Sequence, residues 1–239
     1  MIIFKRESLV KAMPLPENNL LFGFAPRLTA EQREYVDAIF DYQLVMVNAK
    51  AGTGKTTLAV ACAKLFKQPL TYIFNPVQES AMGFRPGTQS EKESIYHQPL
   101  MDALLEINEN PAQCVYNEEA LVNEAIRRKV SMKRVMDSIW CYPKTPLFLR
   151  GTNLKDMTII IDECQNFTVQ ELRKIFTRVH DSCKVICIGH SGQIDIPVSK
   201  SGFVPYMEHF KNQPYCKILT LTKNFRGELA NWADSFQNN

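Results

Sequence analysis

The sequence lacks the patterns that usually mark secreted, zinc-stabilised or membrane proteins. Its 239 residues include seven cysteines, an odd number, and no two of them form a Cys-x-x-Cys pair. Zinc ribbons and disulfide scaffolds use paired spacings, so free thiols in a reducing compartment are the favoured interpretation. No apolar run is long enough to span a bilayer, and the first ten residues carry charges that do not fit a secretory signal. We therefore expect a cytoplasmic protein.

The sequence also lacks a strong excess of either positive or negative charge. Lysine and arginine together number 28, aspartate and glutamate 25, and the net charge is only +3. Such a balance permits nucleic-acid binding but does not establish it. Hydrophobic residues make up 45% of the chain, which is enough for a packed core.

The most informative stretch runs from Gln43 to Phe66. Gln43 to Val47 is a short apolar run that suits a buried parallel strand. Ala49 to Thr56 fits a phosphate-binding loop, with alanine in place of the usual first glycine. Leu58 to Phe66 then has helical periodicity. The strand, loop and helix in this order favour a nucleotide site over an ordinary glycine turn.

The chemistry of such a loop assigns roles to its residues. Gly52 and Gly54 allow the backbone to curl tightly around phosphate oxygens. Lys55 would reach the β- and γ-phosphates, and the Thr56 hydroxyl would ligate Mg²⁺. The predicted ATP-binding residues of the loop are Ala51, Gly52, Thr53, Gly54, Lys55, Thr56 and Thr57.

Leu28 to Phe40 reads as an amphipathic helix ahead of the first strand. Gln32 allows two interpretations. It can form a capping box with Thr29, or its amide can pair with N6 and N7 of adenine, as the Q motif of many helicases does. The two interpretations are compatible, because Gln32 can cap the start of the helix and contact adenine at the same time.

Met157 to Ile161 is a second apolar strand, and it ends in Asp162-Glu163. This is the pattern of a Walker B strand, in which Asp162 would hold Mg²⁺ and Glu163 would polarise the attacking water. A strand that ends in a solvated acidic turn is the plain alternative. The phosphate loop upstream favours the catalytic interpretation.

A further helix is predicted to begin at Thr168, with Thr168 and Glu171 as a capping box. Two later segments offer further candidates. Cys183 to His190 reads as a buried strand, and Gln193 follows at its carboxyl end, where it could sense the γ-phosphate. His190 is expected to be a hydrogen-bonded loop histidine rather than a metal ligand. Lys217 to Lys223 reads as the last strand, and Arg226 precedes a final helix, Glu228 to Phe236. Arg226 is either an arginine finger or a surface arginine.

Residues 77–150 differ in pattern and read as a helical insertion between the second strand, Leu70 to Asn75, and the Walker B strand. Helices are predicted at Glu91 to Ile107 and within Glu118 to Trp140. A basic face there is either solvated or a track for a phosphate backbone, and it comprises Arg127, Arg128, Lys129, Lys133 and Arg134.

Taken in order, these motifs resemble the PhoH-like ATPases (phosphate-starvation-inducible proteins), which are close to the superfamily 1 helicases. The resemblance covers about Leu28 to Phe236. Besides the phosphate loop and the Walker B strand, it rests on Gly83-Phe84, Pro86-Gly87, Arg150-Gly151, Gln165-Asn166, Gly189, Gln193 to Asp195 and Ser201-Gly202. Asn75 and His190 depart from the arginine and aspartate usual at those places.

The resemblance implies Mg²⁺-dependent ATP hydrolysis, a RecA-like α/β fold with a mostly parallel sheet, and a homo-oligomeric ring. It adds Arg150 as a candidate catalytic arginine. We expect residues 1–239 to form one such domain, with an N-terminal arm over 1–27 and the insertion over about 77–150. The chain resembles the compact form that phages carry, which would place it in the host cytoplasm.

Three functions remain open on the sequence. The first is an ATPase stimulated by single-stranded RNA or DNA, RNA helicases included, with a neighbouring subunit completing the polymer-binding surface. The second is an ATP-dependent switch or scaffold without motor activity. The third is a nucleotide or nucleoside kinase, which the missing zinc-binding cysteine pairs and the long insertion disfavour.

Overall fold

The computed structural model describes residue 15 and residues 18–76, 97–149 and 151–234. Within these ranges, one parallel sheet has the strand order β3-β2-β4-β5-β1-β6. Its strands are β1 (Leu44–Ala49), β2 (Leu70–Ile73), β3 (Cys141–Lys144), β4 (Thr158–Ile161), β5 (Lys184–Gly189) and β6 (Cys216–Leu221).

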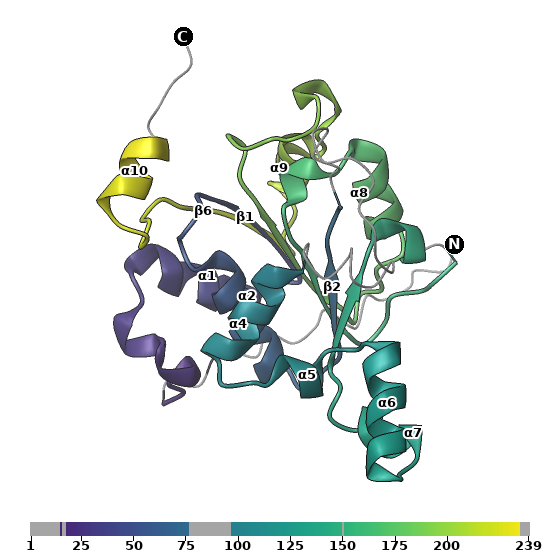
Figure 1. Ribbon diagram of the computed structural model, residues 1–239. Coiled ribbons are helices and arrows are strands. Elements are labelled where there is room, and N and C mark those ends of the chain that lie inside the picture. Colours follow the sequence, from purple (N-terminus) through teal and green to yellow (C-terminus); the bar gives the residue numbers. More distant parts are fainter. Residues whose placement is uncertain (1–14, 16–17, 77–96, 150, 235–239) are drawn as a thin grey trace.

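Helices cover both faces of the sheet (Figure 1). One face is covered by α1 (Ala30–Asp41), α2 (Lys55–Leu65) and α4 (Gln98–Glu106), and the other by α8 (Val169–Phe176) and α9 (Phe203–Phe210). Helices α5 (Pro111–Cys114), α6 (Glu118–Arg128) and α7 (Met132–Met136) lie towards one edge of the sheet, and α10 (Glu228–Asp234) projects at the opposite side.

Strand β1 shows why the sheet needs helices on both faces. Its side chains alternate between two hydrophobic clusters: Val45 and Val47 pack with α1 and α2, whereas Leu44 and Met46 pack with α8 and α9. All four are buried. A strand buried on both faces reads as a continuous apolar run, as predicted for Gln43 to Val47.

The order of the central strands places the two nucleotide motifs near each other. Strand β5 lies between β1, which leads into the phosphate loop, and β4, which ends in Asp162. All three run parallel, so their carboxyl ends meet at one edge, where α/β sheets bind ligands. The fold is the expected α/β, RecA-like P-loop fold.

The insertion contains a strand in addition to the expected helices. Strand β3 lies inside residues 77–150 and pairs with β2, so the insertion also extends the sheet. The sequence did not predict this strand because it contains Pro143. Proline has no N–H to donate to the hydrogen bonds between strands and normally argues against a strand. β3 is an edge strand, where the missing donor is tolerated.

Local capping signals were predicted correctly. Thr29 with Gln32 and Thr168 with Glu171 both form reciprocal capping boxes, at the starts of α1 and α8. The predicted final helix is α10, described as far as Asp234. Leu21, in the part of the N-terminal arm that the structure describes, is fully buried against the core.

A buried lysine joins α1 to the sheet. The Lys184 ammonium, at the start of β5, donates to the carbonyl oxygens of Phe40 at 2.6 Å and Tyr42 at 2.8 Å. These carbonyls lie at the end of α1, where a cation is favourable. Within the described residues, no helix is both long and apolar enough to cross a membrane.

Candidate functional site

The phosphate loop occupies residues 50–54, between β1 and α2. Gly52 and Gly54 adopt φ values of +74° and +78°, a region that disfavours side chains with a Cβ. The Thr53 hydroxyl donates to the Lys50 carbonyl at 3.0 Å and closes the loop. Helix α2 begins at Lys55, so its first N–H groups and its positive dipole end face the loop, as anion binding requires.

Gln32 braces this loop from α1. Its Oε1 accepts a hydrogen bond from the Thr29 N–H at 3.1 Å, and its Nε2 donates to the Thr53 carbonyl at 2.9 Å. The capping-box interpretation is therefore confirmed, and the bond to the loop is an addition that spacing alone did not indicate. Each amide atom retains capacity for one further hydrogen bond, and adenine recognition by Gln32 stays a prediction.

Thr56 and Asp162, the two predicted Mg²⁺ ligands, lie in contact. The Thr56 hydroxyl donates to Asp162 Oδ2 at 3.2 Å, although the residues are 106 positions apart in the chain. The Asp162 side chain is almost fully buried, and its Oδ1 accepts from the Glu163 N–H at 2.9 Å. The structure thus brings these two residues together, and their role as Mg²⁺ ligands stays a prediction.

Tyr72 is a neighbour of Asp162 that the sequence did not reveal. Its hydroxyl, on β2, donates to Asp162 Oδ2 at 2.5 Å. Burial, and then the charge of Asp162, raise the pKa of Tyr72 well above its ordinary value, so it stays a donor. A tyrosine in an apolar strand usually reads as core, and only the β2–β4 pairing brings it to the site.

The residues present fit a magnesium ion. A hydroxyl and a carboxylate are hard oxygen ligands, which Mg²⁺ prefers. Among the described residues, no three His, Cys, Asp or Glu side chains group closely enough to hold a metal. The remaining ligands would be phosphate oxygens and water, as is usual for nucleotide-bound Mg²⁺.

Glu163 adopts a left-handed backbone conformation, with φ +52° and ψ +44°. Such a conformation is costly for a residue with a Cβ and is found at functional sites. The residue keeps an exposed surface, yet the protein atoms around its carboxyl group desolvate it. This desolvation, followed by the charge of Asp162, raises the pKa of Glu163, against the opposing effects of Gln165 and Lys55.

Gln165 connects Glu163 to the end of β5. Its Nε2 donates to Glu163 Oε2 at 2.6 Å, and its Oε1 accepts from the His190 N–H at 2.9 Å. The side chain of Gln165 is buried, so these two bonds fix its position. A shift of the turn after β5 would therefore be transmitted directly to the Glu163 carboxylate.

The turn after β5 carries Gln193 and is fastened to the phosphate-loop strand. Asn48 and Ser191 exchange two hydrogen bonds of 3.0 Å. Gln193 is exposed in this turn, and its N–H donates to the His190 carbonyl at 3.1 Å. The His190 Nδ1 is buried without a hydrogen-bond partner in the described part of the chain, so the expected hydrogen bond of this imidazole is absent at that atom.

Arg226 lies in a turn that packs on the phosphate loop of its own chain. The Phe225 N–H donates to the Gly52 carbonyl at 2.9 Å, and the Arg226 N–H donates to Asn224 Oδ1 at 2.6 Å. A Cβ on Gly52 would lie 2.5 Å from Asn224 Oδ1 and 2.7 Å from Arg226 Cγ. This contact places the turn with Arg226 beside the phosphate loop within one chain, and the role of Arg226 as an arginine finger stays a prediction.

Two predicted features lie outside the described residues. They are the candidate arginine Arg150 and the segment with Gly83-Phe84 and Pro86-Gly87. Sequence reasoning also missed Asn224 and Phe225, which contact the phosphate loop only because β6 pairs with β1.

Comparison with known proteins agrees with the motifs. The family model described as PhoH-like protein matches residues 25–235. Protein PhoH2 of Bacillus subtilis (strain 168) is 31% identical over 204 residues, which are 81% of this chain and 42% of that protein. A PhoH-like protein of Mycobacterium leprae (strain TN) is 33% identical over 191 residues, which are 76% of this chain and 49% of that protein.

The chain thus spans about half the length of the curated relatives it matches. Among solved structures, it is similar to Pif1 of Bacteroides sp in complex with ADP-AlF4, with 17% sequence identity and a TM-score of 0.41. That similarity covers 87% of this chain and 44% of that one. With the phosphate loop and Asp162 arranged as described and the family model matching nearly the whole chain, we conclude that this protein belongs to the PhoH-like protein family.

Proposed function

We propose that this protein is a Mg²⁺-dependent ATP hydrolase whose turnover is stimulated by single-stranded nucleic acid. The observation that carries the hydrolase assignment is the 3.2 Å contact between Thr56 and Asp162. It joins a helix N-terminus suited to phosphate with a carboxylate suited to Mg²⁺, and Glu163 directly follows that carboxylate in the chain.

The chain's own residues have separable roles in this proposal. Lys55 and the loop N–H groups bind the phosphates, while Thr56 and Asp162 hold the metal ion. When bound, Mg²⁺ supplies charge neutralisation at the β- and γ-phosphate oxygens. Glu163 accepts the proton of the attacking water, and its raised pKa makes it a stronger base for that step.

Gln193 and Arg226 complete the proposed catalytic group. Gln193 lies in the turn that Asn48 fastens to β1, which suits a sensor of the γ-phosphate. Arg226 stabilises negative charge on the transferring phosphoryl group from its place beside Gly52. Gln32 supports the loop and contacts adenine with its remaining hydrogen-bonding capacity.

The nucleic-acid part of the proposal rests on the family and on the cationic helices of the insertion. Assembly into a homo-oligomeric ring is also proposed, since one RecA-like unit supplies only one side of a polymer track. Exposed apolar side chains near the C-terminus, Phe225 and Leu229, suit contact with a second copy. Sedimentation that shows a monomer with full stimulated activity would argue against the ring.

The test is steady-state ATPase of the purified chain with Mg²⁺, with and without single-stranded RNA or DNA. Lys55→Ala is expected to abolish turnover, and removal of Mg²⁺ with a chelator to do the same. Stimulation by one polymer would support the nucleic-acid role and identify the polymer. A basal rate that neither polymer changes would leave the hydrolase assignment intact and favour the switch or scaffold. No hydrolysis under any condition would refute the proposal.

A further inference from the structure

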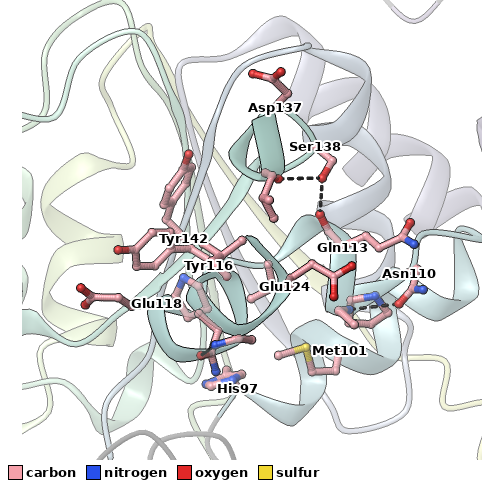
Figure 2. A pocket seen from close by; sticks show the side chains of 18 of the residues that line it. His97, Met101, Asn110, Gln113, Tyr116, Glu118, Glu124, Asp137, Ser138 and Tyr142 are labelled. Atoms are coloured by element: carbon pink, nitrogen blue, oxygen red, sulfur yellow. Dashed lines mark hydrogen bonds between the residues drawn. The ribbon is translucent and has the colours of Figure 1, made fainter. Parts of the chain in front are cut away.

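A large cavity lies away from the phosphate loop, between the helices of the insertion and its strand β3 (Figure 2). Its volume is about 1440 Å³. Pockets for small molecules usually measure about 300–1,000 Å³, so this cavity suits an extended ligand. It is bounded by α4 to α7, by the ends of β2 and β3, and by the segment after β3.

Two tyrosines form an aromatic surface in this cavity. Tyr116 and Tyr142 stack with ring centroids 5.7 Å apart and an interplanar angle of 27°. They come from different segments and lie side by side in Figure 2. The Tyr116 N–H donates to the Cys141 carbonyl at 2.8 Å, which fixes the two segments together. Tyr116 is 38% exposed and the nearby Phe148 55%, so aromatic faces remain accessible.

The charges around the tyrosines leave cations uncompensated. Arg127 and Arg128 share a single carboxylate, that of Glu124, at 2.6 and 2.5 Å. Across the described residues, Arg134 and Lys144 have no ion pair, and both line the cavity. Glu118 and Asp137 are the other acids of the lining. The wall therefore offers positive charge next to aromatic rings, which is the combination that binds single-stranded nucleic acid.

The cavity wall is one strand away from the catalytic carboxylates. The Phe74 N–H donates to the Lys144 carbonyl at 3.2 Å, and both residues line the cavity. The next residue, Asn75, donates from Nδ2 to the Asn166 carbonyl at 2.8 Å. The Asn166 N–H in turn donates to the Glu163 carbonyl at 2.9 Å. An occupant of the cavity thus lies at one end of a short hydrogen-bonded path to Glu163.

We propose that this cavity is the binding site for single-stranded nucleic acid, with Tyr116 and Tyr142 stacking on unpaired bases. Arg134 and Lys144 contact the phosphate backbone of the same strand. The inference rests on the proposed function, since it locates the polymer that stimulates hydrolysis.

The test uses the full chain and fluorescently labelled oligouridine RNA and oligothymidine DNA of about 20 nucleotides, with affinity read from anisotropy. Tyr142→Ala should weaken binding roughly five- to a hundred-fold, the range for loss of one stacking partner. Tyr142→Phe keeps the ring and should bind like the parent. Arg134→Glu should weaken binding at low salt and make its dependence on salt concentration shallower.

The matched control is Arg173→Glu, the same charge reversal on α8, outside the cavity lining. It should leave the affinity near that of the parent. The cavity variants should retain basal ATPase, since none of them belongs to the catalytic group, while more polymer is needed for half-maximal stimulation. Arg134 is exposed, so its variant remains informative if Tyr142→Ala does not fold.

The outcomes separate the two proposals. If Tyr142→Ala and Arg134→Glu bind and are stimulated like the parent, the polymer binds elsewhere and the cavity assignment is overturned, while the ATPase proposal stands. If the parent binds neither oligonucleotide but hydrolyses ATP, the cavity assignment and the polymer stimulation both fall and the hydrolase remains. If Arg173→Glu weakens binding as much as Arg134→Glu, the effect is general electrostatics and the site is refuted.

Discussion

The buried Lys184 gives the chain a pH-dependent stability that can be measured directly. Lys184 is 4% exposed, and its ammonium donates to two carbonyls at the end of α1. Burial lowers the pKa of Lys184 from 10.5 to about 8, against a smaller opposing effect of Asp41. The folded state therefore binds this proton less tightly than the unfolded state does.

The sign and size of the effect follow from this shift. Between the folded and unfolded pKa values, the unfolded chain binds more protons, so the Lys184 contribution to stability rises with pH. One pKa unit corresponds to about 1.4 kcal/mol. From about pH 7 to about pH 9.5, Lys184 should add roughly 2 kcal/mol to the free energy of unfolding. Lys184→Met, which is similar in length and uncharged, lacks this gain.

Urea unfolding of the parent and Lys184→Met at these two pH values is the assay. At neutral pH, Lys184→Met leaves two carbonyl groups without their donor, which lowers the free energy of unfolding by about 1–3 kcal/mol for each carbonyl. Removal of the buried charge offsets this loss by roughly 3 kcal/mol. The stability of the parent relative to Lys184→Met should then rise by roughly 2 kcal/mol at the higher pH. Lys174→Met, on the exposed side of α8, should show no such change relative to the parent. A parent–variant difference that does not change with pH would refute the reasoning.

Further predictions concern the nucleotide site and one helix cap. Glu163→Gln should lower turnover about 10²- to 10⁴-fold while ATP binding, read by a fluorescent analogue, persists; parent-like hydrolysis would remove Glu163 as the base. In the parent, turnover should decline on acidification through a pKa above that of an ordinary glutamate, because Glu163 must be ionised. Gly52→Ala should strain the loop by about 1–2 kcal/mol. It should also lower turnover as Arg226→Ala does, because the added Cβ would displace the turn that carries Arg226. Full activity of Gly52→Ala would show that Gly52 does not position Arg226. Thr168→Ala should lower the free energy of unfolding by about 1 kcal/mol in chemical denaturation, and Thr168→Ser should restore it.

The features that the sequence predicted well are those that local chemistry decides. The phosphate loop, the Asp162 strand end and the two capping boxes each depend on residues within a few positions of one another. The contact between Thr56 and Asp162 was also foreseeable, because both motifs end parallel strands and such ends meet at one edge.

The features that the sequence did not predict depend on which strands become neighbours. Tyr72 reaches Asp162 because β2 pairs with β4, and Phe225 reaches Gly52 because β6 pairs with β1. Neither pairing has a signature in spacing. β3 was missed for a different reason, since Pro143 is unfavourable in a strand unless the strand lies at an edge. The cavity of the insertion likewise arises only when β3 brings Tyr142 beside Tyr116.

The turn over Gly52 has a practical consequence for anyone who shortens this protein. A chain cut after Leu221 would retain every strand of the described sheet and look complete on a ribbon drawing. It would nevertheless lose the Phe225 N–H that bonds the Gly52 carbonyl and the Thr222 groups that bond Glu31. The smallest fragment that keeps these contacts to the phosphate loop and α1 therefore extends at least to Arg226, and a tag or fusion partner belongs beyond that residue.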